Sequence, residues 1–420
     1  MATARARLAT MAWRNIWRNR RRTLITLFGI VFGVFMAVLF TGIGDSTYGQ
    51  MIDHAARLGG GHVVVQHPEY QELPTLKKTV HDAAAVETAA GELPQVVGTT
   101  TRISGAAMLS TAKNSQGTFF IGIDPQREDD QTFGILDAAW EGQMLQAADQ
   151  TQAIVLGRAL ADNLEAKLGS KVVYTVTDKE GEIVSALARV VGIVETGAPS
   201  LDASLCLLPI DVVREHLGYA PGEATLVAVF LGDHRDAEDV AATLGARLDA
   251  ASPGAVALTW AEAQPDLAGF IAMKEGGAVI FEVIIMVLLA AGIFNTLFVS
   301  VMERLREFGI MAAIGFMPRQ LFGLVMWESI WLALVGLVGS VLVIAGPYYH
   351  LSTKGIDYST LIGDGAEVAG VAMDPILYVR IYPGSALVIA VVVVVATLVS
   401  GLYPAWRAGR ANPADAIRLV

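Results

Sequence analysis

The sequence predicts an α-helical membrane domain of four transmembrane helices plus a large α+β extracytoplasmic domain between helices 1 and 2. The composition, 53% hydrophobic and 17% charged over 420 residues, is too apolar for an ordinary soluble protein and too polar for a chain embedded throughout. A bilayer span needs about 20 mostly apolar residues. The long middle segment, 45–276, has no such run, whereas four stretches qualify: 24–43, 278–302, 321–345 and 385–403.

These runs divide the chain into successive parts. The predicted membrane helices are 24–44, 277–302, 321–346 and 385–404. The predicted cytoplasmic parts are a basic amphipathic helix at 1–23, a short helix at 303–320 and a tail at 405–420. The predicted periplasmic parts are the α+β domain at 45–276 and a loop at 347–384.

The orientation follows from the basic residues, because cytoplasmic flanks accumulate Arg and Lys. Arginines cluster before the first run, between the second and third, and after the fourth, whereas 45–276 holds 32 acidic and 15 basic residues. We therefore expect a multi-pass protein of the bacterial inner (cytoplasmic) membrane with both termini in the cytoplasm. A cleaved signal peptide is the alternative for the N-terminus. The first run is longer than an h-region of about 7–15 residues, and no small-x-small cleavage site follows it.

The N-terminal segment 5–22 places Leu8, Ala12 and Trp13 near one face of a helix and its arginines mostly on the others. This pattern is typical of a basic helix lying on the inner membrane surface. A plain positive anchor without a further role fits the same residues equally well. The sequence leaves both interpretations open.

The segment 45–276 alternates β-rich runs with helical ones, which indicates an α+β domain, and we expect about 94–150 to form a second lobe. The single cysteine, Cys206, excludes an intrachain disulfide and is interpreted as a buried small residue. The expected strands are 62–66, 152–156, 171–177, 183–194 and 226–230, and the expected helices are 160–168, 211–217 and 236–250.

Familiar catalytic motifs are missing from the sequence. ATP hydrolysis needs a phosphate-binding G-x-x-x-x-G-K-[ST] loop, and no Gly-Lys-Ser or Gly-Lys-Thr occurs. The H-E-x-x-H of zinc proteases and the G-x-S-x-G of hydrolases are also absent. His62 and His67 flank a strand-like run and are interpreted as packing or surface residues. We expect a chain that is not an enzyme and has no metal or cofactor of its own.

Two acidic residues lie within the apolar runs, where ionisable groups are costly and often functional. Glu282 lies about one turn inside the second run, and Glu328 about two turns from the inner end of the third. We favour side chains that reach toward the membrane interface. A proton or substrate role is the alternative.

The segment 303–320 contains more information than any other. It begins with charges, and Phe308, Met311, Ala312 and Gly315 follow at helical spacing before Pro318. A solvated turn would not need its apolar residues. We therefore predict a short amphipathic helix that inserts into a groove of a partner protein.

Several segments together resemble FtsX-like, MacB-type ABC transporter permeases over nearly the whole chain. ERLREFGIMAAIGFMPRQ, at 303–320, is similar to the coupling loop of that family. WRNIWRNRRRTLITLFGIVFGV resembles its Arg-rich first span, AIVLGRALADNLEAKLGSKVVYTV its external strand–helix–strand element, and LYPAWRAGRANPADAIRLV its C-terminal signature.

The resemblance implies a non-catalytic permease subunit that pairs with a second permease copy or a paralogue. The pair would sit on two copies of a cytoplasmic ABC ATPase subunit, which would bind ATP and Mg²⁺. Mechanotransmission would then carry ATP-driven closure to the external domains. The ATPase-coupling residues that the resemblance implies are Glu303, Arg304, Glu307, Gly309, Ile310, Met311 and Gly315.

Chain length and FIGIDP at 120–125 look most like the lipoprotein-releasing (Lol-type) permeases. The cargo would then be a lipoprotein that enters a lateral cleft between span one of one subunit and span two of the other, and a periplasmic carrier would receive it. Apolar residues in spans also commonly face lipid or another helix. The implied substrate cleft contains Phe32, Phe35, Met36, Phe40, Phe281, Ile285 and Leu289.

Two further functions remain open. The Arg-rich entry to the first span is as much like a MacB-type exporter of a peptide, toxin or drug, which would work with a periplasmic adaptor. A signalling permease that regulates a cell-wall hydrolase is the third hypothesis, and the length of the external domain disfavours it. Membrane lipid is an expected contact, and nucleic acid is not, because the external domain is acidic.

Overall fold

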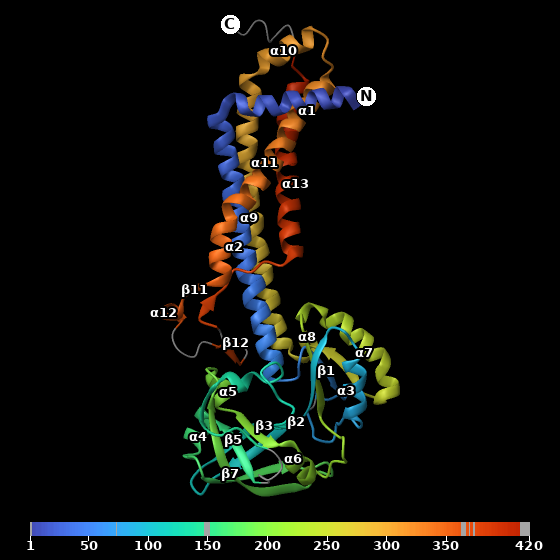
Figure 1. The fold of residues 1–420 in the computed structure, drawn as a ribbon, viewed down its shortest axis with the longest axis vertical. Helices are drawn as coiled ribbons and strands as arrows, with labels where there is room; N and C mark the ends of the chain where they lie inside the picture. The colour runs from blue at the N-terminus through green and yellow to red at the C-terminus, as the bar shows by residue number, and fades with distance from the viewer. Residues whose placement is uncertain are drawn as a thin grey trace. The chain divides into compact units, whose positions relative to one another are not determined.

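The computed structural model describes residues 2–72, 74–146, 152–362, 367–368, 370–372 and 374–411 (Figure 1). Most of the predicted tail, 412–420, and part of the predicted lobe, 147–150, lie outside the described residues. The chain divides into two compact units. The membrane unit contains residues 1–47, 273–357 and 376–420, and the sheet unit contains residues 48–272 and 358–375.

The described residues contain four helices that are long and apolar enough to span a membrane, as predicted. They are α2 (Arg20–Leu58), α9 (Pro265–Glu303), α11 (Pro318–Thr353) and α13 (Pro383–Gly409). At 1.5 Å per residue, the 39 residues of α2 or α9 extend about 58 Å, roughly twice the bilayer core. Both helices continue beyond the predicted spans. The prediction ended each span at residue 44 or 277, where the hydropathy falls, but no proline interrupts the helical backbone beyond these points.

Small residues allow close packing among these four helices. A Cβ at Gly336 of α11 would lie 2.7 Å from Cγ2 of Ile30 on α2, and a Cβ at Gly401 of α13 would overlap the Ser329 hydroxyl oxygen of α11. Neither position has room for a side chain. The two glycines therefore allow α11 to contact its neighbours closely. Such packing at small residues is common in membranes, because the hydrophobic effect does not drive helices together within lipid.

The N-terminal helix α1 (Ala2–Ile16) lies across the membrane unit and packs against α11 (Figure 1). Ala12 and Ile16 are buried, and the indole nitrogen of Trp331 donates to the Ala9 carbonyl at 3.0 Å. The Trp13 and Trp331 rings are 5.1 Å apart. These contacts show that α1 is fixed to the bundle, which a plain positive anchor would not require.

The sheet unit is built on a ten-stranded sheet of order β10-β1-β9-β2-β3-β8-β5-β7-β4, with β6 paired to β2 and β7. Among its described pairs, only β3–β8 and β5–β7 are parallel. The strands are β1 (Val63–Gln66), β2 (Val96–Ser110), β3 (Ser115–Ile123), β4 (Ala139–Gly142), β5 (Ala153–Gly157), β6 (Lys171–Thr177), β7 (Ile183–Glu195), β8 (Leu205–Pro209), β9 (Leu226–Leu231) and β10 (Val256–Thr259).

The predicted second lobe at about 94–150 was wrong in its extent. Its strands β2 and β3 pair with β9, β6 and β8, so this stretch shares the common sheet. A smaller apolar cluster does exist there, but it also needs Val155, Val194 and Leu207 from later strands. The expected helix at 160–168 was too long, because Glu165 has a φ of 48° and α4 ends at Asn163.

The remaining elements are short. The helices of the sheet unit are α3 (Ala83–Gly91), α4 (Arg158–Asn163), α5 (Pro199–Asp202), α6 (Ile210–Leu217), α7 (Ala237–Ala251), α8 (Trp260–Ala263) and α12 (Ser359–Ile362), with 3₁₀ turns η2 (Gly134–Asp137) and η3 (His234–Asp236). The hairpin strands after α11 are β11 (Ile356–Asp357), β12 (Glu367–Val368), β13 (Val371–Ala372) and β14 (Ile376–Leu377). The membrane unit also holds η1 (Trp17–Asn19) and α10 (Leu305–Ala313).

Candidate coupling site in the membrane unit

Helix α10 occupies the segment between the second and third membrane helices. Arg304, with φ −103° and ψ 10°, separates it from α9, and Pro318 starts α11. At its C-terminal end, Gly315 has a φ of 105° and the Phe316 amide donates to the Met311 carbonyl at 3.0 Å. This is a glycine-terminated helix end of the Schellman type. A side chain at Gly315 would strain the backbone, so substitution there would alter the helix end as well as any partner contact.

The apolar side chains of α10 and the turn after it divide into two groups. Phe308 is fully buried among Ala12, Val301 and Leu321, which fixes the helix to the bundle. By contrast, Ile310, Ile314 and Met317 are 49%, 72% and 66% exposed. An exposed apolar group beside a fixed helix is the type of surface that a partner protein covers.

The charged residues of this region form a network of ion pairs. Arg304 contacts the Glu307 carboxylate at 3.1 Å through Nε and the Glu328 carboxylate at 2.9 Å through Nη1. Arg18 pairs with Glu307, and Arg22 contacts Glu303 at 2.7 Å. The Arg18 guanidinium, with Arg304, holds the pKa of Glu307 below its ordinary value. The network therefore joins η1, α2, α9, α10 and α11.

Glu328 does not reach toward the interface, so that prediction was wrong. Its side chain is buried, with the residue 5% exposed, and Oε1 accepts hydrogen bonds from Asn15 Nδ2 and Arg304 Nη1, each at 2.9 Å. The bundle supplies a cation and an amide at that depth, so the carboxylate is stable inside. Glu282 is half-buried and accepts a hydrogen bond of 2.5 Å from the Thr41 hydroxyl on the facing helix α2.

The implied ATPase-coupling residues therefore have different surroundings. Glu303, Arg304 and Glu307 are engaged in ion pairs inside the chain, and Gly309 is buried. Met311 is half-buried against the bundle, Gly315 forms the helix end, and Ile310 is exposed. Sequence reasoning missed the Glu328 and Asn15 contacts of this network. Only the position of Glu328 inside an apolar run was a signal for them.

An apolar groove of about 580 Å³ lies between α2 and α9. Of the residues implied as a substrate cleft, Phe32, Met36, Ile285 and Leu289 line it. Phe35 instead packs in the bundle core, and Phe40 and Phe281 are exposed outside the groove. The groove extends further toward the start of α2 than the sequence indicated. The lining residues that sequence reasoning missed are Ile25, Thr26, Phe28, Gly29, Gly33, Leu288, Gly292, Ile293 and Thr296.

Glycines account for the shape of this groove. A Cβ at Gly29 would meet nothing within 4 Å, so the groove is open beside it. A Cβ at Gly33 would lie 3.1 Å from the Leu289 side chain, so α2 and α9 approach each other there. Gly33 was the available sequence signal for the approach of the two helices, because small residues mark close helix packing.

Titratable groups in the sheet unit have structural contacts. His62 is buried, accepts from the Leu231 amide at 3.1 Å and contacts Asp53 at 3.0 Å, so it is a packing residue as predicted. Cys206 is fully buried, and burial raises the pKa of its thiol. Among the described residues, no group of three His, Cys, Asp or Glu could hold a metal ion.

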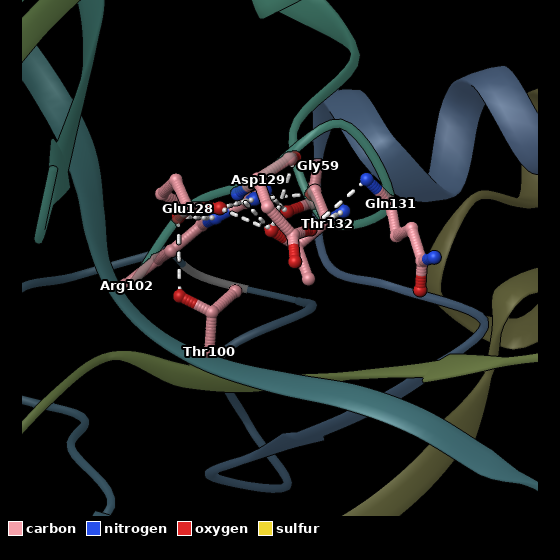
Figure 2. A network of polar contacts seen from close by, with 7 residues as sticks. All are labelled: Gly59, Thr100, Arg102, Glu128, Asp129, Gln131 and Thr132. Carbon is pink, nitrogen blue, oxygen red and sulfur yellow. Dashed lines mark hydrogen bonds and ion pairs between the residues drawn. The ribbon is translucent and has the colours of Figure 1, made fainter. Parts of the chain in front are cut away.

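A buried polar network of the sheet unit surrounds Arg102 (Figure 2). Arg102 and Glu128 form an ion pair of 2.9 Å in which each side chain is 1% exposed. Arg102 also donates to the carbonyls of Gly59, just after α2, and Thr132. The network thus ties the end of α2 to β2 and to the loop 124–133. No sequence pattern pointed to it, because Glu128 lies in an irregular segment.

Two family models match the chain. One describes a MacB-like periplasmic core domain and matches residues 23–247, more than half of the sequence. The other describes an FtsX-like permease C-terminal region and matches residues 279–413. The first match contains β1 to β9, and the second contains α10, α11 and α13.

Several relatives are similar over most of this chain. The pyoverdine export ATP-binding/permease protein PvdT of Pseudomonas entomophila is 26% identical over 97% of the chain, which spans only 58% of that protein. An uncharacterized ABC transporter permease of Methanocaldococcus jannaschii is 24% identical over 98% of this chain and 97% of its own. The lipoprotein-releasing system transmembrane protein LolC of Xylella fastidiosa is 23% identical over 77% of this chain and 78% of its own.

The predicted layout is confirmed by the fold and the family models together. Four apolar helices form the membrane unit, and an α+β extracytoplasmic domain is inserted between the first two. The FtsX-like region matches the last three of these helices. The chain therefore belongs to the FtsX-like, MacB-type family of ABC transporter permeases.

Proposed function

We propose that this permease couples a cytoplasmic ABC ATPase to its external domain and thereby releases lipoproteins from the membrane. The observation that carries the coupling part is the geometry of α10. Its exposed Ile310 and Ile314 form an apolar surface, and Phe308 and the Arg304–Glu328 pair fix the same helix to the bundle. A partner that binds the exposed surface moves a rigid element, since the interactions that hold α10 are buried.

The chain offers a continuous route for that movement. Arg304 ties α10 to α11, Glu307 pairs with Arg18 of η1, and Glu303 pairs with Arg22 at the start of α2. Helix α2 then continues without a break into the sheet unit, where Arg102 binds the Gly59 carbonyl. A displacement of α10 by ATP-driven closure would thus reach the external sheet through ion pairs and a covalently continuous helix.

This mechanism requires α10, α1 and both termini to face the cytoplasm of an inner membrane. The arginines near α1 and α10 support that orientation, because cytoplasmic flanks carry the basic residues. In the working complex, two copies of the ATPase would bind ATP and Mg²⁺ and contact two permeases. The second permease would be another copy or a paralogue.

The groove between α2 and α9 supports a lipid-linked cargo. Its lining is almost entirely apolar, and Met36, Ile285 and Leu289 offer a surface that suits an acyl chain. The similarity to LolC, named for lipoprotein release, agrees with this cargo. A periplasmic carrier would receive the released lipoprotein.

A second candidate is export of a peptide, toxin or drug through a periplasmic adaptor. It is favoured by the similarity to PvdT, which extends over 97% of this chain. The two cargoes can be distinguished by mass spectrometry of the complex purified with its ATPase in nanodiscs. Release of acylated lipoproteins on ATP addition supports the first candidate, and release of a non-acylated peptide or small molecule supports the second.

Ile310→Asp is expected to reduce ATP-driven release by roughly tenfold or more, while the ATPase retains basal hydrolysis. A buried carboxylate would replace an apolar contact at the partner surface, and such a charge is costly to bury. The measurement is release per ATP hydrolysed by the reconstituted complex.

Ile183→Asp is the matched control, because Ile183 is a 76% exposed isoleucine in the sheet unit. It should leave the release per ATP unchanged. Normal release in Ile310→Asp would contradict the docking role of α10.

A further inference from the structure

The apolar groove between α2 and α9 continues into a polar pocket. This pocket, of about 330 Å³, is lined by residues of α2, α9 and η1, and it shares Ile25 and Thr296 with the groove. One continuous site therefore has a hydrocarbon part and a polar end. The residues at the polar end are Asn19, Arg21, Arg22, Asn295, Thr296 and Val299.

The polar side chains at this end have unused donors. Within the described part of the chain, no hydrogen bond or ion pair engages the side chains of Asn19, Arg21 or Asn295, whereas Arg22 is paired with Glu303. Asn295 is exposed, yet it lies eight residues before the end of α9, about 12 Å into the helix. An amide that faces hydrocarbon without a partner is unfavourable, so a polar ligand group is expected beside it.

From this arrangement we infer that the site binds an anionic diacyl phospholipid. The phosphate would lie between Arg21 and Arg22, and the Asn19 and Asn295 amides would donate to phosphate or ester oxygens. One acyl chain would follow the groove from Ile25 to Met36. That distance is about 16 Å along α2, which is roughly half of a bilayer core and matches the depth of one leaflet.

Charge selects the occupant. Glu303 offsets the charge of Arg22, and Arg21 adds a cation without a partner among the described residues, so the pocket has a net positive charge that suits a single phosphodiester. Zwitterionic lipids would present their own cation to the same pocket. Basic pockets between membrane helices on the cytoplasmic side bind anionic head groups in general. This inference uses the proposed cytoplasmic orientation of Arg21 and Arg22, and the phospholipid would occupy the same groove that the acyl chain of the proposed cargo would enter.

The test is native mass spectrometry of the full-length protein in detergent, titrated with phosphatidylglycerol or phosphatidylcholine. We expect phosphatidylglycerol to bind about tenfold more tightly than phosphatidylcholine. Arg21→Gln should weaken phosphatidylglycerol binding about fivefold and leave phosphatidylcholine unchanged, as expected for the loss of one basic contact. Gly29→Leu should weaken binding of both lipids, because its side chain would fill the open groove.

Arg14→Gln is the matched control, because Arg14 is an exposed arginine of α1 that does not line the pocket. It should leave both affinities unchanged. Equal binding of the two lipids by the unaltered protein would overturn the inference, as would equal losses in Arg14→Gln and Arg21→Gln. A failed lipid titration would leave the ATPase coupling and the cargo untouched, since those have separate measurements.

Discussion

Arg102→Ala is expected to lower the free energy of unfolding of the sheet unit by about 3 to 5 kcal/mol. The substitution leaves the Glu128 carboxylate buried without its cation and removes the donors to the Gly59 and Thr132 carbonyls. The measurement is hydrogen–deuterium exchange of the full-length protein in nanodiscs. Peptides that cover β2 and the loop 124–133 should exchange roughly a hundredfold to several thousandfold faster.

Lys113→Ala provides the control for a surface ion pair. Lys113 contacts Glu165 at 2.5 Å with side chains 68% and 54% exposed, so solvent screens the pair and its loss should leave the stability of the sheet unit nearly unchanged. The double variant Arg102→Met/Glu128→Leu should recover part of the loss, because it removes both buried charges. Recovery stays incomplete, since the two carbonyls still lack donors. A loss of less than about 1 kcal/mol in Arg102→Ala would contradict this account of the network.

The second large effect is expected for Glu328→Ala in the membrane unit. The variant leaves Arg304 with Glu307 as its remaining ion-pair partner and the Asn15 amide without its acceptor. We expect the free energy of local opening of α10 to fall by about 3 kcal/mol, which would give faster amide exchange across 305–313. Release per ATP should fall with it, because the ATPase would then move a helix that is poorly connected to the bundle.

Two further variants separate this effect from a general loss of charge. Glu328→Gln keeps an acceptor for Asn15 and Arg304 and should have a smaller effect. Glu303→Ala removes the more exposed Arg22 contact and should also have a small effect on exchange in α10. If Glu303→Ala loosened α10 more than Glu328→Ala, the buried pair would not be what holds the helix.

The helices and strands of the fold could be predicted because each one follows from a local pattern of apolar and polar residues. Runs such as 278–302 are apolar over the length of a bilayer, and 171–177 alternates as a half-buried strand, as the structure confirms. The ends of α2 and α9 could not be predicted from hydropathy. Residues 45–58 are polar enough for an external domain, yet they continue the helix that begins in the membrane.

The site contacts depend on residues far apart in the sequence, and this is why they escaped prediction. The sequence placed Glu328 about two turns inside the third apolar run. Asn15 and Arg304, whose hydrogen bonds make its burial stable, lie elsewhere in the chain. Hydropathy likewise identified Phe40 as apolar without indicating which way it faces. Its exposure outside the groove depends on how α2 packs, which a single helix pattern does not determine.

The central claim is that α10 is the surface that contacts the ATPase, and site-specific cross-linking tests it most directly. Cys206 is fully buried, so Ile310→Cys introduces a single accessible thiol. Tyr349→Cys is the control, because Tyr349 is 72% exposed and lies near Thr353, at the opposite end of α11 from Pro318.

In the reconstituted complex, the account predicts that a short thiol–amine cross-linker joins Ile310→Cys to the ATPase and leaves Tyr349→Cys unlinked. Addition of ATP should change the yield at position 310, because coupling requires a contact that differs between the states of the ATPase. Cross-linking from Tyr349→Cys with none from Ile310→Cys would contradict both the docking role of α10 and the proposed orientation in the membrane.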